Sequence, residues 1–308
     1  MKRILRFLGL AALSLIALSG PACSQPATSS ANAAITVTDQ LGRTVTIDKP
    51  PQRIVSLAPS NTEILYALGL ADRVVAVTSY DDFPPEVKQK PNIGGFSNPS
   101  LEKIISFTPD LVVATQIQQK QVIPELEAKG ITVLALNPTT MEEVMSAITM
   151  VGEVTATSSK ASQVVSGMQK RIKAVTDKTD KLTSAQRPKV LYIVWHDPLM
   201  ASGSGTFHDE LIKKAGGTNV VSANGYPSIS LESVIQSNPD VILAGIGMGD
   251  GQDAPLKFAQ DETRLRDVSA RVKNQIYGVD SSMSGRAGPR IVDVLEQFAS
   301  LIHPELFK

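Results

Sequence analysis

The chain has 308 residues, and its 30 Lys and Arg balance its 30 Asp and Glu, giving a formal net charge of zero. This balance excludes the strongly basic character typical of proteins that bind nucleic acid or acidic membrane surfaces through overall charge. The length is sufficient for one large domain or two of ordinary size.

The first residues have the pattern of a secretory signal peptide. Lys2 and Arg3 precede an apolar run from Ile4 to Leu18, which ends in small residues. A spanning helix needs about 20 apolar residues, and no later segment has such a run. We therefore predict a signal peptide over residues 1–22 and an exported protein, periplasmic or at the cell surface.

The single cysteine, Cys23, comes directly after this run and cannot form an internal disulfide. It is either a lipidated N-terminal residue or an incidental cysteine, and "GPAC" lacks the Leu that usually precedes a lipoprotein Cys by three residues. We predict lipidation, which would anchor the protein to a membrane while its folded part stays outside the lipid. Residues 23–34, rich in Ser, Ala and Pro, form the predicted tether.

Residues 35–139 predict an α/β lobe. "ITVTDQLGRTV" alternates apolar and polar residues, as a half-buried strand or hairpin does. Short apolar runs then alternate with helical patterns, which indicates a parallel sheet covered on both faces. In the first helix, "SNTEILYALGL", Ser60 or Asn61 can act as the cap and Glu63 suits the first turn. The other predicted strands are "RIVSLA", "RVVAVT", "LVVAT" and "ITVLALN".

Residues 140–183 contain no Pro, and their apolar residues recur at spacings of three and four, which predicts one long helix or two in succession. In residues 184–308 the α/β plan returns, with predicted strands "VLYIVW", "VILAG" and "IYGVD" and a last helix, "RIVDVLEQFASLI". The predicted fold class is α/β, with two similar lobes of mostly parallel sheet joined by a helical linker.

One segment occurs twice. "LEKIISFTPDLVVAT" begins at Leu101 and "LESVIQSNPDVILAG" at Leu231. In each copy a Ser caps a helix whose first turn holds a Glu, Glu102 or Glu232; a cap and a favourable first-turn charge together contribute about 1 kcal/mol. The alternative role is docking, because two related lobes would present both carboxylates to paired cations on a symmetric partner.

No catalytic constellation is recognisable. "SGSGTF" lacks the Lys-Ser/Thr ending of a P-loop, and no G-x-S-x-G elbow is present. The chain has only three His, and they are scattered along the sequence, so we expect no metal site built from protein side chains alone. We expect no enzyme and no intrinsic cofactor.

From Ile35 onward the chain resembles the substrate-binding proteins of ABC importers for cobalamin, siderophores and haem, through "RIVSLAPSNTEILYALG", "SYDDFPPEV", "ASGSGTFHDELIKKAGGTNVV", "RAGPRIVDVLEQF" and both repeat copies. "APSNTE" and "SYDDFPP" are most similar to the vitamin B12 branch. The resemblance implies the bilobal class III fold, with a long linking helix and a ligand in the cleft between the lobes. It also implies a permease, with its ATPase, as the partner, and Glu102 and Glu232 match the family's docking glutamates.

The resemblance further implies a bound corrinoid, with a ferric siderophore or haem as the alternative. Tyr80 and Phe96 match aromatic positions that contact the corrin, although Phe96 replaces the usual Trp. Trp195 and His196 follow a strand where the family also contacts its ligand, and His196 could coordinate cobalt or iron.

The last loop, "SMSG", departs from the cobalamin branch, which has aromatics and an acidic residue there. In this loop Met283 could fill the space beneath a bulky ligand. Arg286, and less so Arg290, could pair with ligand carboxylates or phosphate, or could face solvent or pair locally.

Overall fold

The computed structural model describes residues 34–247 and 253–307, which form one compact unit. The predicted signal peptide, Cys23 and nearly all of the tether lie outside these ranges. None of the helices within them combines the length and hydrophobicity needed to span a bilayer.

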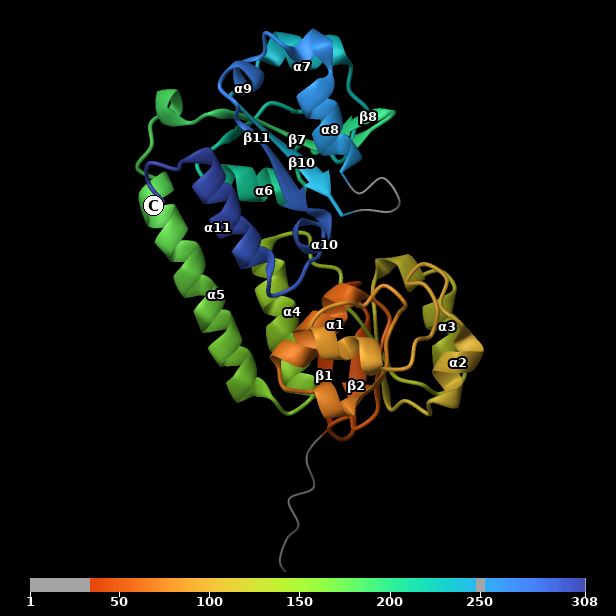
Figure 1. The fold of residues 1–308 in the computed structure, drawn as a ribbon. Helices are drawn as coiled ribbons and strands as arrows, with labels where there is room; N and C mark the ends of the chain where they lie inside the picture. The colour runs from red at the N-terminus through yellow and green to blue at the C-terminus, as the bar shows by residue number, and fades with distance from the viewer. Residues whose placement is uncertain (1–33, 248–252, 308) are drawn as a thin grey trace, which may run out of the picture. The chain divides into compact units, whose positions relative to one another are not determined.

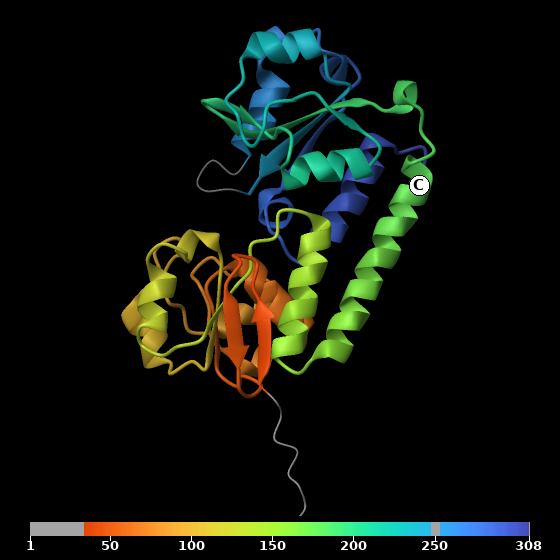
Figure 2. The same cartoon turned by 180° about the vertical axis from the view of Figure 1, so that it is seen from behind.

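The N-terminal lobe begins with an antiparallel hairpin and continues as a four-stranded parallel sheet (Figures 1 and 2). The order of the sheet is β4-β3-β5-β6, so the chain starts near the centre of the sheet and fills it toward both edges. The strands are β1 (Ile35–Thr38), β2 (Thr44–Ile47), β3 (Ile54–Ser56), β4 (Val74–Ala76), β5 (Leu111–Ala114) and β6 (Val133–Ala135). The helices are α1 (Pro59–Ala67), α2 (Leu101–Ser106) and α3 (Val122–Glu127).

Both faces of this sheet are buried, as the all-apolar strands predicted. In β5, Leu111 and Val113 belong to a cluster that includes residues of α1, whereas Val112 and Ala114 belong to a second cluster with residues of α2 and α3. Alternate side chains of a strand point to opposite faces, so helices cover the sheet on both sides.

The predicted cap of α1 is wrong. The helix begins at Pro59, a favoured first helical residue, and its cap residue Ala58 makes no side-chain bond. Asn61 instead donates to the carbonyls of Val113 and Ala114 at the end of β5. Glu63 lies beyond the first turn and is only 4% exposed.

The linker consists of two helices, α4 (Met141–Val154) and α5 (Ser158–Thr179). Ala156, at φ 58°, lies in the left-handed region within the turn between them. A side chain at Gly152 would come within 2.4 Å of the Ala161 Cβ, so this glycine permits the close approach of α4 and α5. The longer helix, α5, packs against α4, α6 and α11, and thus contacts elements of the second lobe (Figure 1).

The C-terminal lobe has a five-stranded sheet with the order β11-β10-β7-β8, in which β9 also pairs with β7. Its strands are β7 (Lys189–His196), β8 (Leu199–Ala201), β9 (Thr218–Asn219), β10 (Val241–Ile246) and β11 (Ile276–Asp280). Its helices are α6 (Phe207–Lys214), α7 (Leu231–Ser237), α8 (Ala254–Asp261), α9 (Ser269–Val272), α10 (Ser281–Ser284) and α11 (Ile291–Ile302).

The β7–β8 pair is antiparallel, and it corrects the prediction that Trp195 and His196 follow the strand. Trp195 and His196 are the last residues of β7 and pair with Met200 and Leu199. The strand continues past "VLYIV" because a turn at Asp197 returns the chain alongside it.

The repeated segments have the same structure in both lobes. Ser100 and Ser230 each accept a bond from a backbone N–H of the first turn, as predicted. From position 101 and position 231, nine of the first ten residues have the same burial class. The aspartates also match: Asp110 accepts from the amides of Gln52 and Arg53, and Asp240 from the amide of Lys189.

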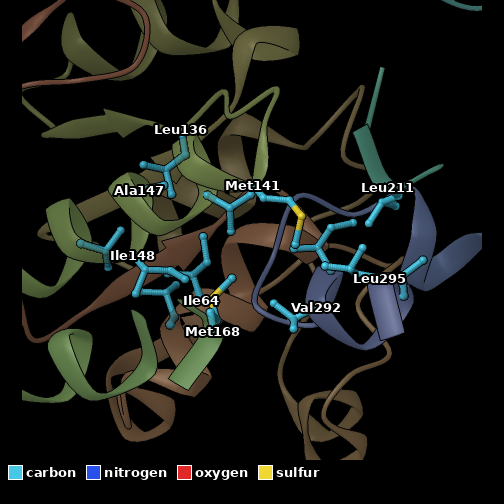
Figure 3. Close-up of a cluster of buried hydrophobic side chains, with 14 of the residues drawn as sticks. Ile64, Leu136, Met141, Ala147, Ile148, Met168, Leu211, Val292 and Leu295 are labelled. Atoms are coloured by element: carbon cyan, nitrogen blue, oxygen red, sulfur yellow. The ribbon is translucent and has the colours of Figure 1, made fainter. Parts of the chain in front are cut away.

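The largest apolar cluster is shared by the two lobes and the linker (Figure 3). It joins Ile64 of α1, Ile148 of α4 and Met168 of α5 to Leu211 of α6 and Leu295 of α11. The lobes are therefore connected by a continuous core as well as by the chain.

Candidate functional site

A pocket of about 640 Å³ is lined by residues of both lobes. Its N-terminal side is formed by the start of α1, by Tyr80 and Phe96, and by the residues after β5, which include Ile117. Its C-terminal side is formed by Tyr226 and by residues 285–287. The volume lies within the range of ordinary small-molecule sites.

Aromatic side chains from both lobes border this pocket. The rings of Tyr80 and Phe96 meet edge to face with centroids 5.5 Å apart. The backbone carbonyl of Phe96 accepts a hydrogen bond from the Gln118 side chain, which fixes the loop that carries the ring. Tyr80 is 58% exposed and Tyr226 is 48% exposed, so both leave ring surface available for stacking.

Tyr226 was missed by the sequence reasoning. It stands alone between Gly225 and Pro227, in a loop with no periodic pattern. The aromatic residue flanked by turn formers was the only available signal.

A carboxylate of the N-terminal lobe binds two arginines of the C-terminal lobe. Glu63 accepts from Arg290 at 2.6 and 3.0 Å and from Arg286 at 3.3 Å. The Glu63 side chain is only 2% exposed, so water has little access to these contacts. The Arg290 guanidinium also lies 3.9 Å from the centre of the Phe83 ring, a cation–π contact.

Arg286 is the member of this group that lines the pocket. Besides Glu63 it donates to the Asp82 carboxylate and to the Tyr80 carbonyl. Partial burial raises the pKa of Asp82, but the hydrogen bond and charge of Arg286 outweigh it and lower that pKa. The two arginines thus face two carboxylates, and the group has no net charge.

Three predicted residues do not line the pocket as its described residues define it. Trp195 donates from its ring nitrogen to the Asp197 carbonyl at 2.9 Å, and its ring centre lies 5.0 Å from that of His196. The buried Nδ1 of His196 has no hydrogen-bond partner within the ranges that the structure describes. Met283 packs against the shared apolar cluster. Ligand contact by these three side chains stays a prediction.

Another histidine, His208, contacts the ring of Tyr226, which borders the pocket. The His208 ring is 3.9 Å from the Tyr192 ring and 6.2 Å from that of Tyr226, which borders the site. Burial lowers the pKa of His208 to about 4, so the imidazole is neutral near pH 7. Its Nδ1 has no partner among the described residues.

The two glutamates of the repeat lie apart from the ligand pocket. Glu102 and Glu232 are exposed in the first turns of α2 and α7. Hydrogen bonds from its own backbone amide and from Ser230 lower the pKa of Glu232. Glu102 borders a separate hollow of about 510 Å³ between α2 and α3.

Over residues 34–247 and 253–307, no group of three or more His, Cys, Asp or Glu is arranged to hold a metal ion.

Comparison with known proteins relates this arrangement to a family. Residues 54–283 match the model of the family described as "Periplasmic binding protein". An uncharacterized ABC transporter substrate-binding lipoprotein, YvrC of Bacillus subtilis, is 34% identical over 97% of both chains. A cobalamin-binding protein of Halobacterium salinarum is 26% identical over 95% of this chain and 82% of its own. The periplasmic heme-binding protein RhuT of Roseiflexus, in apo form, has a TM-score of 0.73 and 26% identity, covering 83% of this chain and 99% of that one.

Proposed function

The chain belongs to the periplasmic binding protein family, and from this premise we propose that it captures a corrinoid, such as cobalamin, between its lobes. It is a substrate-binding protein of an ABC importer, and the family serves transport and not catalysis. Its cargo is a transported ligand, and it needs no cofactor of its own.

The observation that carries the corrinoid proposal is the neutrality of the pocket. Arg286, the charged side chain among the described lining residues, is held by Glu63 and Asp82. The remaining polar groups are hydroxyls and amides, such as those of Thr115 and Asn137. A corrinoid has a broad ring and peripheral amides, which suit aromatic stacking and neutral hydrogen bonding. Tyr80, Phe96 and Tyr226 would supply the stacking surface.

A ferric siderophore or haem is the alternative, supported by the likeness to the heme-binding RhuT. The carboxylates of haem, or an anionic iron chelate, would gain from free cations in the site. Binding such a ligand through Arg286 would require its separation from Asp82 and Glu63, and this cost favours the corrinoid.

We also propose the membrane arrangement of the protein. Lipidation of Cys23 would tether the lobes outside the lipid, and the B. subtilis relative is named a lipoprotein. Glu102 and Glu232 would then dock on cationic side chains of the importer's permease, which works with its ATPase. The first-turn position supports this role, because it leaves both carboxylates in water.

The ligand is tested by visible absorption during titration of the mature protein with cyanocobalamin, haemin and a ferric siderophore. We expect cyanocobalamin to bind with micromolar or better affinity. Binding of haemin or the siderophore alone would overturn the corrinoid assignment.

A variant tests the charge argument directly. Asp82→Asn removes one of the two carboxylates that balance Arg286, so haemin affinity should rise about fivefold while cyanocobalamin affinity changes little. Asp48→Asn, at an exposed position of the same lobe, is the matched control and should change neither. Equal effects of the two substitutions on haemin would show that Arg286 does not govern selectivity.

A further inference from the structure

Exposed apolar side chains single out one position in each lobe. Among the described residues, the large apolar side chains that remain exposed are Tyr80, Phe83, Ile105, Ile117, Tyr226, Ile235 and Val272. Tyr80, Ile117 and Tyr226 border the ligand pocket, and Phe83 lies against Arg290. Ile105, Ile235 and Val272 are left without a role.

Ile105 and Ile235 occupy the same place in the two copies of the repeat. They are 38% and 44% exposed, whereas the preceding residues, Ile104 and Val234, are buried. Core packing explains why Ile104 and Val234 are apolar. It does not explain why the exposed residues that follow them are apolar as well. Helix propensity gives no reason either, because Ile is a poorer helix former than Lys, Glu or Gln.

Each isoleucine lies three residues after the exposed glutamate of its helix. Residues three apart share a helix face, so Glu102 and Ile105 form one patch and Glu232 and Ile235 form another. Beside Ile105 the hollow between α2 and α3 is lined by Leu101 and Ala128, which extends the apolar part of that patch.

Each patch also has other charged residues near its glutamate. Glu102 and Glu125 lie around the first hollow with one cation, Lys129. At the second patch, the positive charge of Arg264 helps to lower the pKa of Glu232. Arg264 also donates a hydrogen bond to Glu262. The exposed glutamate of each patch favours a partner with basic groups.

We propose that Ile105 and Ile235 are the apolar anchors of the contact with the permease, one in each lobe. The partner would present the same surface twice, each time an apolar recess beside a basic side chain. Such an anchor contributes affinity by leaving water, while the neighbouring glutamate fixes orientation. This inference rests on the proposed function, since it concerns the same docking event.

The test measures binding of the mature chain to the importer's permease–ATPase complex in lipid nanodiscs. Ile105→Ser and Ile235→Ser should each weaken binding about tenfold, and the double variant about a hundredfold. Val272→Ser is the matched control, because Val272 is 71% exposed and lies outside both patches, and its affinity should stay within about twofold of the original. Thermal unfolding and cyanocobalamin titration should give unchanged values for all variants.

The outcomes separate the two proposals. If the double isoleucine variant binds as tightly as the unmodified chain while Glu102→Lys with Glu232→Lys does not, the anchors are wrong and docking through the glutamates stands. If the unmodified chain fails to bind the complex, the proposed function is itself wrong. The anchor role would also be overturned if the isoleucine variants lost no more affinity for the complex than Val272→Ser does.

Discussion

His208 is a buried histidine whose protonation opposes folding. Its side chain is stacked on Tyr192 and is only 5% exposed, and burial lowers its pKa from 6.5 to about 4. The unfolded chain therefore binds a proton at this residue at pH values where the folded chain does not. The contribution of neutral His208 to the free energy of unfolding is fully present above pH 6.5 and is lost as the pH falls toward 4.

Because of His208, we expect the free energy of unfolding to be about 2 kcal/mol lower at pH 5 than at pH 7.5. His208→Phe keeps an aromatic ring but cannot titrate, so the variant should lose this part of the pH dependence. Urea denaturation at both pH values measures it. A variant at 208 with the same pH dependence as the original would refute the assignment.

The arginines show why residue patterns alone could not define the site. Arg286 and Arg290 were expected to meet a ligand anion, to face solvent or to pair locally. They pair instead with Glu63, which precedes them by 223 and 227 residues. The sequence pattern of Glu63 is that of a helix start, and only the approach of the two lobes gives it a different partner.

At the scale of elements, the repeat has a third shared feature besides its cap and glutamate. Asp110 and Asp240 end the helix-to-strand connections and accept bonds from backbone amides at the start of the adjacent strands, just before β3 and at the first residue of β7. Each aspartate therefore satisfies backbone donors there and joins its connection to the adjacent strand. This role of the two aspartates could not be predicted, because a sequence does not show which neighbouring strand an acceptor will reach.

Asp110→Ala should lower the free energy of unfolding by about 1–3 kcal/mol, since it leaves the amides of Gln52 and Arg53 without their acceptor. Asp110→Asn keeps one acceptor oxygen and should cost less. Chemical denaturation measures both. Ser106→Ala is a control at an exposed position of α2, and a cost for Asp110→Ala no larger than that of this control would contradict the role.

The elements themselves followed well from apolar runs and spacing. Every apolar run predicted as a strand is one in the structure, and both faces of the first sheet are covered as expected. The exceptions are set by tight turns, which the apolar pattern does not show. The pairing of β8 extends β7 through Trp195 and His196, and a left-handed turn at Ala156 decides that the linker is two helices.

At the scale of the whole molecule, the group of Glu63, Arg286 and Arg290 holds the two lobes together on one side of the pocket. Arg290→Met would leave buried Glu63 with a single contact to Arg286, at 3.3 Å. Breaking a buried pair by removing one partner costs about 3–5 kcal/mol. Denaturation should show a loss of this size, and hydrogen exchange should become faster around Phe83 and Arg286.

Arg264→Met gives the matched comparison, because it removes an arginine from an exposed pair with Glu262. Its cost should be at most about 1 kcal/mol. Equal costs for the two substitutions would mean that the Glu63 group is not a buried connection between the lobes.

The long separation between Glu63 and its partners has a consequence for the order of folding. The N-terminal lobe can begin to fold before residues 286–290 have docked on it. During that interval Glu63 lacks both of its arginines, and the lobe that carries it bears an uncompensated acidic group. A partly folded chain therefore lacks the stability that this group contributes, and the fold is complete only when residues 286–290 have docked.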